Sequence, residues 1–178
     1  ALAVYGVIVN ISTFVQCCSY SVGQASQPII STNFGAGKGD RIRETLKYAL
    51  GTAAFFSLFW TALSMLMPNV FIRFFMMPTA EVLKIAPSIF RCYGLSFLLL
   101  PLNIFSTYYF QALMKPRVAF IASVTRGLVI SGILIYLLPA TFGGNAIWFA
   151  MPITEAAVAF YVVHEMVKYT KQLSTREV

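Results

Sequence analysis

The sequence has 178 residues, of which hydrophobic types make up 58% and charged types only 11%. A typical soluble domain carries about a quarter charged residues, so a soluble fold of this composition would expose large contiguous apolar patches. Together with a mean hydropathy of +0.76, this composition excludes an ordinary soluble domain, a disordered chain and a disulfide-rich secreted scaffold. An integral membrane protein remains.

Five apolar segments predict an all-α integral membrane protein with about five transmembrane helices. A helix needs about 20 apolar residues to cross the hydrocarbon layer. The segments are separated by Gly-rich turns near residues 37 and 143, by Pro68 with a looser connection after it, and by the polar stretch 115–117. The sequence therefore predicts a membrane bundle over residues 1–172, followed by a cytoplasmic tail over residues 173–178. The predicted spans within the bundle are residues 1–31, 41–67, 80–114, 117–138 and 146–168.

The distribution of basic residues predicts the orientation in the membrane. Nine of them flank one side: Lys38, Arg41, Arg43, Lys47, Lys115, Arg117, Lys168, Lys171 and Arg176. Only Arg73 and Lys84 flank the other side. The positive-inside rule then places the first side and the C-terminus in the cytoplasm, with the chain in the inner or plasma membrane. The net charge of +7 needs no nucleic-acid partner, because the sequence has no basic face or aromatic-basic strip.

The first segment carries a polar stripe at alternating steps of three and four residues: Gly6, Asn10, Thr13, Cys17, Tyr20, Gln24, Gln27 and Ser31. This spacing places the stripe on one helical face. Lipid cannot hydrogen-bond such groups, so the stripe either packs against other helices or lines a hydrated cavity. The cavity hypothesis assigns five residues to a substrate cavity, the last of them next to Pro101 in the third segment: Asn10, Thr13, Tyr20, Gln24 and Asn103.

Two charges lie in the middle of adjoining segments, Arg126 in the fourth and Glu155 in the fifth. An ionisable group inside a membrane is by default a functional hypothesis. Glu155 alone could bind and release a proton, whereas Glu155 paired with Arg126 would be a fixed structural tie. Their similar distance from the turn between the two segments favours the tie.

The sequence offers no catalytic or metal-binding pattern. Its three cysteines have no CxxC spacing, and His164 is its single histidine, so a metal site is not expected. The loop GAGKGD at residues 35–40 follows a helix and has Gly, not Ser or Thr, after its Lys, which excludes a phosphate-binding loop. We therefore expect no enzyme and no resident cofactor.

Several stretches resemble the C-terminal half of multidrug and toxic compound extrusion (MATE) transporters. The most specific is GQASQPIISTNFGAG at residues 23–37, followed by Arg41 and Arg43. Further similarity lies in RCYGLS at 91–96, YFQAL at 109–113, Arg126, and WFAMPITE at 148–155.

The resemblance implies a transporter of twelve helices in two six-helix lobes, with this chain as a fragment that supplies helices eight to twelve, most of the second lobe. It implies secondary active antiport, in which organic and often cationic compounds leave the cell in exchange for Na⁺ or H⁺. The implied partners are the lipid bilayer, small organic substrates and the N-terminal lobe of the same protein. The alternatives are a lipid-linked saccharide flippase of the same superfamily and a non-transporting structural membrane subunit.

The resemblance also bears on the coupling ion. In one branch of the family an acidic residue of the tenth helix helps to bind the cation. No Asp or Glu lies between Lys84 and Lys115 in the matching segment. The site for Na⁺ or H⁺ is therefore expected outside this chain.

Overall fold

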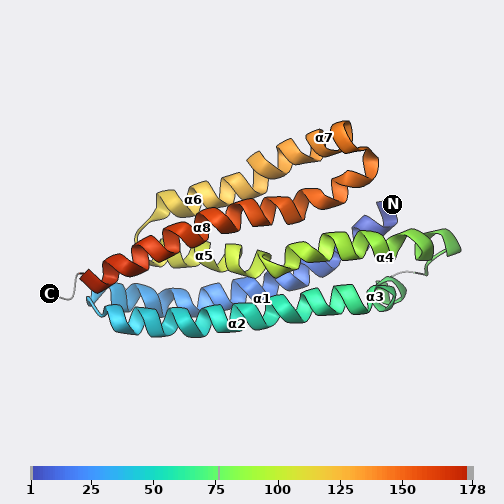
Figure 1. The fold of residues 1–178 in the computed structure, drawn as a ribbon. Coiled ribbons are helices and arrows are strands. Elements are labelled where there is room, and N and C mark those ends of the chain that lie inside the picture. The colour runs from blue at the N-terminus through green and yellow to red at the C-terminus, as the bar shows by residue number, and fades with distance from the viewer. Residues whose placement is uncertain (1, 76, 176–178) are drawn as a thin grey trace.

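The computed structural model describes residues 2–75 and 77–175, and within them every regular element is helical. Eight α-helices follow one another: α1 Leu2–Gly35, α2 Gly39–Leu66, α3 Pro68–Phe75, α4 Ala80–Gly94, α5 Leu100–Ala112, α6 Pro116–Val124, α7 Ser131–Phe142 and α8 Ala150–Thr175. Three short segments join some of them: the 3₁₀ turns η1 (Leu95–Leu98) and η3 (Gly144–Phe149), and the π-helical η2 (Thr125–Ile130). The long helices form an elongated bundle (Figure 1).

The all-α membrane architecture predicted from the sequence is confirmed. Within the described residues, four helical stretches are long and apolar enough to cross a membrane: Gly39–Leu66, Ala80–Ala112, Pro116–Phe142 and Gly144–Leu173. α1 has 34 residues, and the polar side chains of its stripe reduce its hydropathy. One connection differs from expectation, because the chain after Pro68 forms the short helix α3, whose Phe71 ring stacks on Phe90 of α4.

α5 is the central helix of the bundle. It packs against α1, α2, α6 and α8, and most of its side chains are buried. Phe105 and Tyr109 of α5 belong to one apolar cluster, while Leu100 and Ile104 belong to a second. Both apolar and polar side chains of α5 are buried, among them Asn103 and Ser106, so neighbouring helices and not lipid surround most of this helix.

The third predicted span is broken at η1, just before α5. Pro101 has no backbone N–H, so it cannot bond the carbonyl of Phe97 four residues earlier. Ser57 of α2 takes over this role, because its hydroxyl donates to the carbonyl of Phe97 at 3.3 Å and also to that of Leu98. Freed backbone groups inside a membrane need such a partner.

The basic connections lie at one end of the bundle. The turn between α1 and α2, the connection from α5 to α6 and the end of α8 share that end, and the α7–α8 connection lies at the other (Figure 1). Gly37, with φ of +68°, shapes the first of these turns. Of the predicted tail, residues 173–175 continue α8, and residues 176–178 lie outside the described residues.

Replacing Ser57 by Ala should destabilise the protein, because the carbonyls of Phe97 and Leu98 then lose the hydroxyl donor of Ser57 in an apolar setting. Leaving such a group unsatisfied costs about 1–3 kcal/mol, measured as reduced stability against thermal unfolding in detergent. Ser88→Ala is the matched control, since the exposed hydroxyl of Ser88 bonds only within its own helix.

A double-mutant cycle tests the cause of this loss. Pro101→Ala restores an N–H that can reach Phe97, so it should remove much of the penalty of Ser57→Ala. If Ser57→Ala reduced the stability equally in proteins with Pro and with Ala at position 101, this explanation would be contradicted.

Candidate functional site

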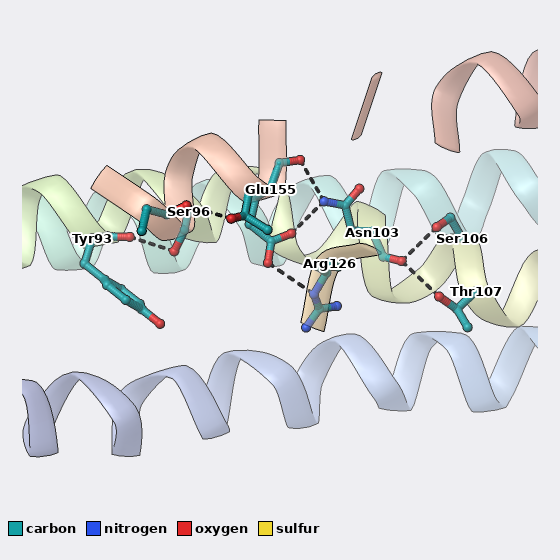
Figure 2. A network of polar contacts seen from close by, with 9 residues as sticks. Tyr93, Ser96, Asn103, Ser106, Thr107, Arg126 and Glu155 are labelled. Carbon is teal, nitrogen blue, oxygen red and sulfur yellow. Dashed lines mark hydrogen bonds and ion pairs between the residues drawn. The ribbon is translucent and has the colours of Figure 1, made fainter. Parts of the chain in front are cut away.

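A buried polar network joins α5, η2 and α8. The Glu155 side chain of α8 is 0% exposed, and its Oε1 lies 3.3 Å from Nε of Arg126 in η2. Asn103 of α5 donates from Nδ2 to Oε2 of Glu155 at 2.6 Å and to the backbone carbonyl of Glu155 at 2.9 Å (Figure 2). The contact between Arg126 and Glu155, expected from their similar depth, is confirmed.

Asn103 does not occupy the place predicted for it. It was predicted to line the substrate cavity together with residues of the α1 stripe, but its side chain is 1% exposed and points to Glu155. The reason is the break at η1, after which α5 begins anew with Pro101 in its first turn. Asn103 therefore positions the carboxylate of Glu155 instead of lining a cavity.

Arg126 lies in an irregular part of its helix. The span predicted over residues 117–138 lies within one helical stretch, Pro116–Phe142. Within this stretch the six residues Thr125–Ile130 are π-helical, which the sequence did not predict. π-helical turns occur frequently at functional sites. The Arg126 side chain is 21% exposed, and its two terminal nitrogens point away from Glu155 and toward α1 (Figure 2).

Arg126 lines a cavity of about 340 Å³ between α1, α5 and the helix that contains η2. Eight residues surround this cavity: Tyr20, Ile104, Thr107, Tyr108, Gln111, Ser123, Arg126 and Gly127. We call it the Arg126 cavity. Its lining combines hydroxyl, amide, aromatic and guanidinium groups, which suits a ligand with both polar and aromatic parts.

The polar stripe of α1 reaches this cavity through Tyr20. The rings of Tyr20 and Tyr108 meet edge to face with centroids 6.3 Å apart. Further along the same two helices, the side-chain amide nitrogen of Gln27 donates to the amide oxygen of Gln111 at 3.3 Å. Gly23 allows this approach, because a Cβ at that position would collide with the ring of Tyr108.

The other predicted cavity residues of α1 lie on the surface of the described chain. Asn10, Thr13 and Gln24 are exposed, as is Tyr20, while the opposite face of the helix is buried in the apolar core. Asn10, Thr13 and Gln24 are therefore not packed between the described helices, whereas Tyr20 contacts Tyr108 of α5 with part of its ring. That they line a hydrated substrate cavity stays a prediction.

Sequence reasoning singled out Tyr20 and Arg126 separately but did not place them in one cavity. It also missed Ser123, which lies three residues before Arg126. This spacing puts two residues on the same helical face, so it could have identified Ser123. Within the described residues, no group of three His, Cys, Asp or Glu side chains is placed to hold a metal ion.

A family model described as MatE matches residues 1–137, which is more than half of the chain. The chain belongs to the MatE family. The polar stripe, the Gly23 motif and Arg126 of this MatE chain all fall within the matched residues. No curated protein matches the sequence at a significant level.

Solved structures show the same fold. A MATE multidrug transporter named DinF-BH, in complex with R6G, is 30% identical with a TM-score of 0.83 over 93% of this chain. A multidrug resistance MATE family transporter of the MOP superfamily in an outward-facing conformation is 18% identical, with a TM-score of 0.87 over 97% of this chain. A MOP superfamily transporter from Pyrococcus furiosus is 17% identical with a TM-score of 0.85, again over 97% of this chain. The MatE chain spans only 37% to 39% of the length of these structures.

Glu155→Gln should destabilise this MatE chain, because it leaves the positive charge of Arg126 without its counter-charge beside an apolar core. Removing one partner of a buried ion pair costs about 3–5 kcal/mol, and the partial exposure of Arg126 places the effect near the lower limit. The measurements are the yield of folded protein in the membrane and its thermal unfolding in detergent.

Replacing both partners by apolar residues of similar size, as in Arg126→Met with Glu155→Leu, should recover much of the loss. Asn103 keeps the backbone carbonyl of residue 155 as its acceptor in this variant. Normal yield and stability of Glu155→Gln would show that the pair is not a structural tie.

Cysteine labelling tests whether water reaches the stripe. In the complete protein, with Cys17, Cys18 and Cys92 replaced, cysteines at positions 10 and 24 should react quickly with a membrane-impermeant thiol reagent. Cysteines at Leu58 and Phe160, which are 62% and 82% exposed on apolar faces, should react slowly because they face lipid. Equal rates at all four positions would overturn the hydrated-cavity hypothesis.

Proposed function

We propose that the chain is part of a secondary active transporter that exports organic compounds, often cationic, in exchange for Na⁺ or H⁺. The observation that carries this proposal is the polar face of α1, which stays exposed on an otherwise apolar bundle and continues into the Arg126 cavity. A polar surface of this kind inside a membrane needs water, a ligand or further helices as its partner, and a substrate path between two lobes would supply all three. Family membership supports the same conclusion.

The side chains on the polar face of α1 suit organic cations with aromatic rings. Tyr20 offers an aromatic face for cation–π contact, while Asn10 and Gln24 offer amide groups for hydrogen bonds. Glu155 is buried and paired, so it adds no exposed negative charge to this face. A cation would therefore be held by rings and amides, a mode of binding that tolerates different substrates.

Transport requires more than this chain. Alternating access arises when two bundles or repeats move against each other around a central site, and the chain spans only 37% to 39% of the similar structures. We therefore propose an N-terminal lobe of the same protein as its partner, with the Na⁺ or H⁺ site outside this chain. The acidic residue within the apolar core of the described helices, Glu155, is already paired with Arg126.

The proposed orientation places the C-terminus in the cytoplasm of a cell whose inner or plasma membrane holds the protein. Its support is the distribution of basic residues, nine against two between the two sides, and the gathering of the basic connections at one end of the bundle (Figure 1). Positive charge is retained on the cytoplasmic side.

R6G, the compound bound in the 30% identical structure, provides a direct test of export. Cells that lack their own efflux pumps and express the complete reading frame containing this chain should retain less R6G than cells with an empty vector. Collapse of both the Na⁺ and the H⁺ gradients should remove the difference, because export against a gradient needs coupling.

The control is the chain alone, reconstituted in liposomes, which should show no R6G-driven ion flux because it lacks the second bundle. R6G retention equal to that of the empty vector, at normal expression of the complete protein, would overturn the export proposal. It would then favour a structural membrane subunit.

A further inference from the structure

We propose that the Arg126 cavity contains a subsite for a carboxylate, so that the transporter also accepts aromatic organic anions and zwitterions. The inference rests on the proposed function, since it takes the cavity as part of the substrate path. It extends that function by naming a second chemical class of ligand and the group that recognises it.

The guanidinium of Arg126 is only half used by the protein. Its Nε lies 3.3 Å from Oε1 of Glu155, whereas the two terminal nitrogens point away from that carboxylate and toward α1 (Figure 2). Arg presents five N–H donors in a rigid fork that matches the two oxygens of a carboxylate. The terminal edge of Arg126 can therefore accept a ligand carboxylate while the Nε side remains on Glu155.

The charges around the cavity select an anion. Arg126 lines the cavity, and its lining includes no acidic residue. Glu155 pairs with the guanidinium on the core side of Arg126, but the Glu155 side chain is 0% exposed and cannot be reached by a ligand. A ligand in the cavity thus meets the positive group of the pair, with the negative group hidden in the core.

The geometry of Arg126 is fixed before a ligand arrives. The carboxylate of Glu155 lies 3.3 Å from Nε of Arg126. Asn103 holds residue 155 through one hydrogen bond to the carboxylate oxygen Oε2 and one to the backbone carbonyl. A side chain already ordered by its neighbours loses less conformational entropy on binding. The same ion pair therefore ties the helices together and prepares the terminal edge of Arg126 for a ligand.

The rest of the cavity suits an aromatic ring system. Tyr20, Tyr108 and Ile104 supply aromatic and apolar wall, and Thr107, Ser123 and Gln111 supply hydroxyl and amide groups. A volume of about 340 Å³ lies at the lower end of the range for small-molecule sites. A compound with an aromatic ring system and a carboxylate matches these groups.

Three probes with the same ring system separate the contribution of charge from that of the ring: naphthoate, naphthalenemethanol and naphthylmethylammonium. Binding to the complete purified protein in detergent is measured by isothermal titration calorimetry. Naphthoate should bind at least about tenfold more tightly than the alcohol, because hydrogen bonds between charged groups exceed those of a neutral hydroxyl by that much.

Arg126→Lys tests whether the two parallel N–H donors of the guanidinium recognise the carboxylate. Lysine keeps a positive charge beside Glu155 but cannot offer two parallel donors, so naphthoate should lose about tenfold in affinity while the alcohol changes less than twofold. Ser123→Phe is an independent variant that fills the cavity without touching the ion pair, and it should weaken all three probes. Thermal unfolding of each variant verifies that it is folded.

Two results would overturn the subsite. One is equal affinity of naphthoate and the alcohol in the unaltered protein, a comparison that needs no variant. The other is naphthoate affinity unchanged in both folded variants.

R6G export, measured in cells that express the same protein, separates this inference from the proposed function. Export of R6G without preference for naphthoate overturns the subsite alone. Naphthoate binding that Arg126→Lys weakens about tenfold, without any export of R6G, supports the subsite and overturns the export function.

Discussion

The bundle depends on how it accommodates one carboxylate in an apolar interior. Glu155 has no access to solvent, and a buried charge is tolerated only when it is paired and hydrogen-bonded. Its partners come from two other segments, Arg126 from η2 and Asn103 from α5. This requirement fixes the relative positions of α5, η2 and α8, and with them one wall of the Arg126 cavity.

The ion pair places its two members in different surroundings. Glu155 lies wholly within the core, whereas Arg126 reaches from the core into the cavity. The π-helical turn that holds Arg126 changes the direction in which side chains leave the helix relative to a regular α-helix. Arg126 can therefore pair with Glu155 in the core and still present part of its guanidinium to the cavity.

The sequence predicted the features that depend on local chemistry. Apolar runs of membrane length predicted the spans, and Gly37 and Gly143, both with positive φ in the structure, marked two of the turns. The depth of Arg126 and Glu155 predicted their contact, because turn positions and the rise of a helix set depth.

Features that depend on tertiary packing were not predictable in this way. A proline inside an apolar run signals a break, but not which way the next helix turns, so Asn103 was assigned to the wrong neighbours. The π-helical turn at Arg126 has no local signal of its own. The Arg126 cavity requires that Tyr20 of α1 meet residues about a hundred positions later, a proximity that only the packing around α5 creates.

The exposed surfaces of the bundle differ in polarity, because α2, α6 and α8 expose apolar side chains whereas α1 exposes a polar stripe. Leu58 of α2, Phe120 of α6 and Phe160 of α8 are exposed apolar residues of the kind that contact lipid. The exposed side of α1 also includes apolar residues such as Phe14 and Ile29, but between them it carries the amides of Asn10 and Gln24, which lipid cannot satisfy. Tyr20 belongs both to this face and to the Arg126 cavity, so the polar face of α1 and the cavity form one continuous surface. A second lobe that enclosed a substrate would have to cover this surface, since the apolar faces are already matched to the hydrocarbon around them.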